Sequence, residues 1–135
     1  MSRSGYSDDC YGAELVLWRG AVTSALCGKR GQAFLREMLA ALDALPEQKL
    51  VSSVLVADGA CCAMGAVAVA RDADVSGIDP FNRHQVAEAF GISGAMAAEI
   101  AYVNDEGNYR GEETPKQRFV RVRKWVVEQI LGEKP

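Results

Sequence analysis

Lys29 and Arg30 are adjacent cations between Gly28 and Gly31, at a point where one amphipathic segment ends and another begins. The start of a helix carries unpaired backbone N–H groups and a partial positive charge, so neighbouring cations favour the binding of an anion there. This chemistry is binding and not catalysis. We therefore expect an anion or partner site at this corner.

Other polar residues could extend or oppose the corner. Arg36 follows one to two helical turns later and would enlarge the basic patch. Asp8 and Asp9, in the N-terminal segment, could neutralise it. Tyr6 and Arg19 complete the set of residues that we expect to bind the anion or partner.

The alternative interpretation of residues 28–31 is a simple turn between two helices, in which the glycines relieve backbone strain. A Walker phosphate loop is excluded. That motif needs Gly five residues before Gly-Lys and Ser or Thr after it, whereas this chain has Thr23 and Arg30 there.

A second motif, residues 84–101, is similar to the core of a helix-turn-helix, with Gly91 at the turn and Ile92-Ser93 opening the second helix. A DNA-recognition helix needs Arg, Lys, Asn or Gln near its start. Residues 94–98 are Gly, Ala and Met, so we interpret the motif as a packing arrangement. The alternative is a nucleic-acid site that adds three basic residues of the last helix: Arg118, Arg121 and Lys124. Exposure of that basic face to solvent, balanced by nearby glutamates, is the simpler interpretation.

No residues have the spacing of a catalytic or metal site, so we expect a non-enzymatic protein without metal or cofactor. Cys10, Cys27, Cys61 and Cys62 form no C-x-x-C pair, and His84 is the sole histidine. We expect reduced, mostly buried thiols, with Cys61 and Cys62 on opposite faces of a strand.

Composition indicates one globular domain over residues 1–135, with residues 1–11 as an irregular N-terminal segment. Hydrophobic residues make up 49% of the chain and the net charge is −3, which gives no global attraction to nucleic acid or anionic membrane. The start of the chain lacks the apolar run of a signal peptide, and no segment is apolar for the roughly 20 residues of a membrane span. We expect a cytoplasmic protein.

The periodicity of apolar residues predicts two helices, from Ala13 to a left-handed cap at Gly28 and from Gly31 to Pro46, packed as an antiparallel αα-hairpin. Asp58-Gly59 predicts the turn of a small β-hairpin with strands near 50–56 and 60–64.

The second half predicts a short helix at 65–70, a helix-turn-helix-like pair near 83–90 and 94–103, a polar loop at 104–108 and a final helix. Thr114, Pro115 and Gln117 form a capping box for that last helix, and Gly132 ends it. The fold class that we expect is α+β and predominantly α-helical.

Several stretches together resemble a family of small, uncharacterised proteins encoded by bacteriophages and prophages. The matching stretches are Ser2-Arg-Ser-Gly-Tyr-Ser-Asp-Asp9, Trp18-Arg-Gly-Ala-Val22, Gly28-Lys-Arg-Gly-Gln-Ala-Phe-Leu-Arg-Glu-Met38, Ala41-Leu-Asp-Ala-Leu-Pro46, Ser76-Gly-Ile-Asp-Pro80, Phe90-Gly-Ile92, Asn104-Asp-Glu-Gly107 and Glu113-Thr-Pro115 through Trp125. Cys27 and the apolar Val54-Leu55-Val56 depart from the more polar versions of this pattern.

The resemblance brings no biochemical role with it. It implies a context: a small phage protein that acts in the host cytoplasm by occupying a surface of a host protein, including components of defence complexes. The expected partner is thus a host protein or an anionic small molecule, with nucleic acid as the alternative. The oligomeric state stays open.

Overall fold

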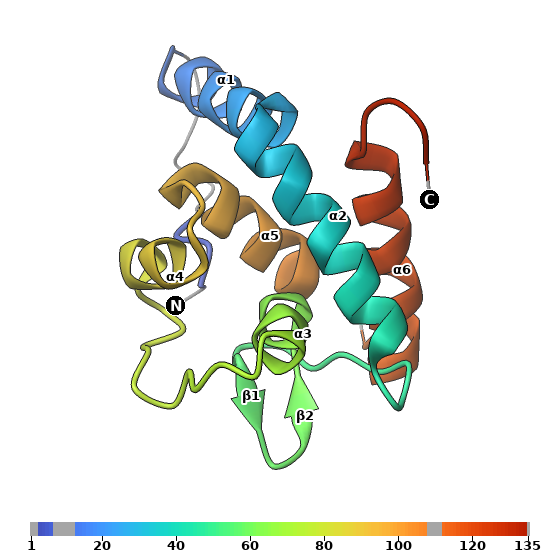
Figure 1. Ribbon diagram of the computed structural model, residues 1–135. Helices are drawn as coiled ribbons and strands as arrows, with labels where there is room; N and C mark the ends of the chain where they lie inside the picture. Colours follow the sequence, from blue (N-terminus) through green and yellow to red (C-terminus); the bar gives the residue numbers. More distant parts are fainter. Residues whose placement is uncertain (1–2, 7–12, 108–111, 135) are drawn as a thin grey trace.

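The structure is a computed structural model that describes residues 3–6, 13–107 and 112–134. These residues form helices and one two-stranded antiparallel sheet (Figure 1). In chain order they are α1 (Ala13–Cys27), α2 (Lys29–Ala44), β1 (Val56–Ala57), β2 (Ala60–Cys61), α3 (Ala63–Ala70), α4 (Arg83–Phe90), α5 (Gly94–Glu106) and α6 (Pro115–Gln129). The expected α-helical α+β class is confirmed.

α5 is the central helix, in contact with α1, α3, α4 and α6 (Figure 1). Its residues are buried from Met96 to Ala101, and again at Val103 and Asn104. Four of its residues are alanines, which let neighbouring helices approach closely. The helix continues to Glu106, so the polar loop expected at 104–108 is wrong for residues 104–106, because Asn104 is buried inside the last turn.

α1 and α2 meet at a one-residue connector, Gly28, and from this corner they pack on different elements. The start of α1 and the end of α2 lie far apart (Figure 1), so the expected antiparallel αα-hairpin is wrong. α2 contacts α3 and α6, whereas α1 contacts α5 (Figure 1). The apolar stripe of α1 is narrower than expected. Val22 and Leu26 are buried, but Val16 and Leu17 are 72% and 74% exposed.

The corner itself is tight. Gly28 is extended, with φ of −67°, so the expected left-handed cap is wrong. The glycine that the geometry requires is Gly31, because a Cβ there would overlap the carbonyl oxygen of Ala25. The first turn of α2 therefore lies directly against the last turns of α1.

The turn of the β-hairpin is as expected, with Asp58 at φ 52° and Gly59 at φ 80°. The ladder is much shorter than the expected strands and pairs only Val56 with Cys61 and Ala57 with Ala60. Ser53 has φ of 68°, which interrupts the extended backbone of the first strand.

The second strand ends at Cys61 because Cys62 becomes the N-cap of α3, where its Sγ accepts a hydrogen bond from the Gly65 amide. Helix α3 thus begins at Ala63, two residues before the expected start. Cys62 therefore lies outside the strand, and the expected placement of Cys61 and Cys62 on opposite faces of one strand is wrong. Both side chains are buried.

The remaining helix ends follow local signals. Asn82 caps α4, and Gly91 ends it in the left-handed conformation with φ of 74°. The Thr114–Gln117 capping box at the start of α6 is present. The regular helix ends at Gln129, three residues before Gly132, because Ile130 is extended and buried in the core.

Arg71, at the end of α3, joins three helices. Its guanidinium pairs with both oxygens of Glu37 on α2, at 2.7 Å each, and lies over the rings of Phe34 and Phe90. The hydrogen bonds from Arg71 lower the pKa of Glu37 from its ordinary value of 4.5. This pair is partly exposed, so its effect on stability is modest.

We expect Glu37→Gln to lower the melting temperature at pH 7. The difference in melting temperature from the wild type should become smaller as the pH is lowered. A carboxylate whose pKa is lowered by folding stabilises the protein above its ordinary pKa, and this contribution is lost as the pH falls through the lowered value. Thermal melts from pH 7 to pH 3 measure the difference. Glu47→Gln, at the more exposed pair with Lys49, is the control and should have a smaller effect. An effect of Glu37→Gln that is constant over this range would contradict the role given to Arg71.

Candidate functional site

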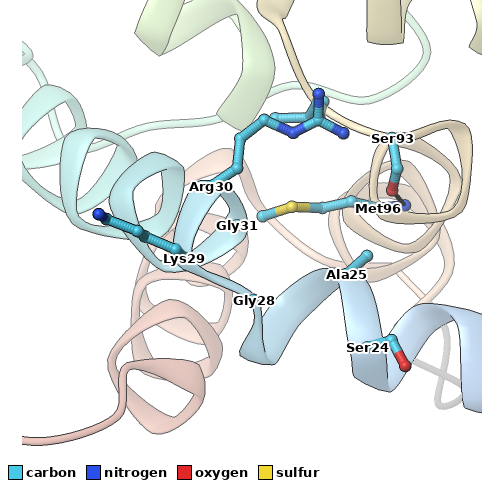
Figure 2. A pocket seen from close by; sticks show the side chains of 9 residues that line it. Ser24, Ala25, Gly28, Lys29, Arg30, Gly31, Ser93 and Met96 are labelled. Atoms are coloured by element: carbon cyan, nitrogen blue, oxygen red, sulfur yellow. Dashed lines mark hydrogen bonds between the residues drawn. The ribbon is translucent and has the colours of Figure 1, made fainter.

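A cavity of about 200 Å³ lies at the corner between α1, α2 and the start of α5 (Figure 2). Three segments line it: the last turns of α1, the first turn of α2, and the turn leading into α5. The lining residues are Ser24, Ala25, Gly28, Lys29, Arg30, Gly31, Ile92, Ser93 and Met96. The corner predicted from the sequence is therefore also a cavity.

Two helix N-termini converge on this cavity. α2 begins at Lys29, and its N-cap, Gly28, offers no side chain to the first-turn amides. α5 begins at Gly94, and its N-cap, Ser93, accepts a hydrogen bond from the amide of Met96. Neither helix has an acidic residue in its first turn. The amides and both helix dipoles thus favour a negative group at this place.

The opposing helix end contributes less negative potential than its position suggests. Among the last carbonyls of α1, Ser24 O accepts from the Gly28 amide and Leu26 O accepts from Gln32 Nε2. Hydrogen bonds to these carbonyls satisfy the groups that a helix C-terminus leaves open.

Arg30 is the cation that belongs to the cavity. Figure 2 shows its side chain extended toward Ser93, whereas Lys29 is directed away from it. Both side chains are exposed, and neither forms an ion pair or side-chain hydrogen bond with any part of the chain that the structure describes. The expected pair of cations is therefore split, and of the two only Arg30 is directed toward the space between the two helix starts (Figure 2).

Arg36 does not extend this site, contrary to the expectation. Its Nη2 donates hydrogen bonds to the carbonyls of Leu131 and Glu133, at 3.0 and 2.8 Å. It fixes the segment that follows α6. No local pattern predicts this contact, because it joins residues almost one hundred positions apart.

Tyr6 and Arg19 lie together outside the cavity, where both contact Glu99 on α5. The Tyr6 hydroxyl donates to Glu99 Oε1 at 2.8 Å, and Arg19 donates to both oxygens of Glu99, at 2.8 and 3.1 Å. Burial, with a smaller contribution from the Glu99 carboxylate, raises the pKa of Tyr6. Tyr6 also packs on the rings of Trp18 and Tyr102. Asp8 and Asp9 lie outside the described residues.

Arg3 is the functional-site candidate that sequence reasoning missed. Its side chain is only 2% exposed and pairs with both oxygens of Asp105, at 2.7 Å each. A single arginine in a polar N-terminal segment has no periodicity that would signal burial. Asp105 was expected in a solvated loop, whereas it belongs to the last turn of α5.

Two of the three basic residues proposed for the nucleic-acid alternative, Arg118 and Arg121, donate hydrogen bonds to backbone carbonyls at the end of α5. Arg118 donates to the carbonyl of Asn104, and Arg121 donates to the carbonyls of Val103 and Asn104. Both also pair with Glu113. These guanidinium groups satisfy the C-terminal end of α5 and complement its dipole. Lys124 is exposed.

α4 and α5 have the bent arrangement of a helix-turn-helix, at 106° to one another. The second helix of the pair is the central helix of the fold, with Met96 to Ala101 buried. A recognition helix needs an exposed face to enter the major groove. The interpretation of residues 84–101 as a packing arrangement is therefore in agreement with the burial of α5.

The thiols and the histidine lie on separate elements. Cys27 is exposed at the end of α1, Cys61 and Cys62 are buried, and all three are free. Burial raises the pKa of the Cys61 thiol to about 11. His84 lies near Gly94, at the start of α5. In the described part of the chain, no three His, Cys, Asp or Glu side chains are placed to hold a metal ion.

No protein-family model, curated protein or solved structure matches this chain significantly. Over residues 3–6, 13–107 and 112–134, no single helix has the length and apolar character of a membrane span, and α4 and α5 reach it only when joined across their bend.

Proposed function

We propose that this chain is a non-enzymatic binding protein whose corner cavity receives an anionic group, a phosphate or a carboxylate, carried by a partner. The observation that carries the proposal is that two helix starts without acidic residues converge on one cavity with Arg30, whose side chain has no ion-pair partner among the described residues. Each of these features attracts an anion, and together they act on the same small volume.

The size of the cavity limits what enters it. At about 200 Å³ it is smaller than the roughly 300–1,000 Å³ pockets that enclose drug-sized ligands. It accommodates one phosphate group or one carboxylate side chain. The rest of the partner would lie on the surrounding surface, where Lys29 is exposed.

The resemblance to phage proteins suggests the kind of partner. We propose a host protein, a defence component among the candidates, that presents an acidic or phosphorylated residue to the corner. With a net charge of −3, the chain has no general attraction for polyanions, so such binding would be local to the corner.

Titration calorimetry with inorganic phosphate at low ionic strength tests the proposal, because exposed charges are then least screened. We expect Arg30→Ala to weaken phosphate binding about tenfold or more, since a hydrogen bond to a charged group contributes about 1.5–3 kcal/mol. Lys29→Ala should have a smaller effect because its side chain is directed away from the cavity.

Lys116→Ala is the matched control, since Lys116 is an exposed cation near the start of α6 and lies outside the cavity lining. Its binding heats should equal those of the wild type. Absence of phosphate binding by the wild type, or an equal loss in Arg30→Ala and Lys116→Ala, would refute the corner as the site.

A further inference from the structure

Residues 3–6 occupy a groove formed by distant parts of the chain. We call this the acceptor groove and define it by the residues whose atoms hydrogen-bond to the segment: Val54, Cys62, Arg83, Glu99, Asp105 and Glu106. They come from the approach to β1, the start of α3, the first turn of α4 and the length of α5. The segment thus lies as an extended ligand would lie.

All three guanidinium nitrogens of Arg3 donate hydrogen bonds. Asp105 takes two parallel hydrogen bonds, the carbonyl of Val54 accepts at 3.1 Å, and Cys62 Sγ lies 3.4 Å from Nη1. Asp105 is itself positioned by the amide of Ser53 and by Asn104 Nδ2. A planar guanidinium fits this arrangement, and a lysine ammonium would lose the paired hydrogen bonds.

The next three residues add specificity. Ser4 Oγ donates to Glu106, and the Tyr6 hydroxyl donates to Glu99. Gly5 has φ of 74°, a conformation that other residues rarely adopt. The groove therefore selects an Arg-Ser-Gly-Tyr sequence by three carboxylates that accept from Arg3, Ser4 and Tyr6, and by the backbone conformation of Gly5.

We infer that the acceptor groove is a peptide-binding site that takes residues 3–6 of a second copy of this chain, so that two molecules exchange these segments. The hydrogen bonds to the groove join residues 51 to 102 positions apart in sequence, and none requires the segment and the groove to belong to the same molecule. Three carboxylates of α5 face a segment whose charged side chain is an arginine, which gives the exchange charge complementarity.

Exposed apolar side chains at the start of α1 support a second copy as the occupant. Leu15, Val16 and Leu17 are 39%, 72% and 74% exposed, and Trp18 beside them packs on Tyr6. Six residues separate Tyr6 from α1 and span at most about 20 Å when extended. An exchanged segment would therefore hold this apolar surface close to the other molecule, where it can be covered.

A peptide of residues 1–9 tests the groove on the full-length variant Arg3→Ala. This variant lacks the arginine that its own segment would place in the groove. We expect the peptide to bind the variant and to raise its melting temperature or, if the variant alone is unfolded, to restore its helical circular dichroism signal. A peptide that carries Arg3→Ala should bind the variant with an affinity at least about tenfold lower. Equal effects of the two peptides, or no effect of either, would overturn the inference of a specific groove.

Mixing two defective full-length variants tests the exchange. The Arg3→Ala variant retains the groove but lacks the arginine. The Asp105→Asn variant retains the arginine but lacks the carboxylate that accepts its paired hydrogen bonds. Sedimentation velocity should show a larger dimer fraction in the equimolar mixture than in either variant alone, and wild type should dimerise with rising concentration. Wild type and mixture that both stay monomeric up to millimolar concentration would show that the segment binds only within its own molecule, against the inference.

Discussion

Gly31→Ala is expected to destabilise the protein by about 3 kcal/mol or more, the upper range for forcing extra atoms into a packed interior. A Cβ at residue 31 would overlap the carbonyl oxygen of Ala25 and lie 2.9 Å from its carbonyl carbon. Both are backbone atoms, so relief requires α1 and α2 to move apart. Intrinsic helix propensity alone would predict the opposite sign, a gain of about 1 kcal/mol.

Gly20→Ala is the matched control for this substitution. Gly20 lies in the middle of α1, and a Cβ there would have no neighbour within 4 Å. It should stabilise the protein by up to about 1 kcal/mol. Chemical denaturation of both variants measures the contrast. A Gly31→Ala variant as stable as the wild type would show that the corner is looser than described, and the cavity beside it would lose its fixed geometry.

Asn104→Asp is expected to destabilise the protein by about 3 kcal/mol or more, although the two side chains have nearly the same shape. Asn104 is 1% exposed, and its Nδ2 donates to the carbonyl of Val51 and to Asp105 Oδ1. An ionised aspartate would turn both donor contacts into contacts between acceptors. It would also place an unpaired charge beside Asp105 in a buried place.

Asn82→Asp is the control for that change of charge. Asn82 is exposed and caps α4 through its side-chain oxygen, a role that aspartate performs equally well. Denaturation at pH 7 should show little change for Asn82→Asp and a large loss for Asn104→Asp. Similar stabilities of the two variants would contradict the role of Asn104 in joining residues 51 and 63 to α5.

Elements with local signals could be predicted from the sequence. Thr114 and Gln117 lie within one helical turn of each other, and Gly91 acts through its own backbone conformation, so α6 and the end of α4 need no distant information. The β-hairpin shows the limit. Asp58-Gly59 specified the turn, but the length of the strands depended on Ser53 and on Cys62, which leave the ladder for contacts with other elements.

The position of the candidate site could be predicted from the sequence, but the full set of residues that form it could not. Gly28 to Gly31 marked the corner, yet the second helix start that completes the cavity comes from residues 93–96, which the sequence separates by more than sixty positions. Arg118 and Arg121 carry charge that typically lies on a solvated face, and only the fold shows that they cap α5. Burial of Arg3 likewise depends on a partner, Asp105, at the far end of the central helix.

The most direct test of the anion-binding corner is an amide NMR titration of the full-length protein with inorganic phosphate. The cavity predicts that the amides of Lys29, Arg30, Gly94 and Ala95, in the first turns of α2 and α5, shift together with one dissociation constant. The amide of Pro115's neighbour Lys116, at the start of α6, should remain unchanged. Shifts in the first turn of one helix only, or equal shifts at Lys116, would contradict a site built from both helix starts.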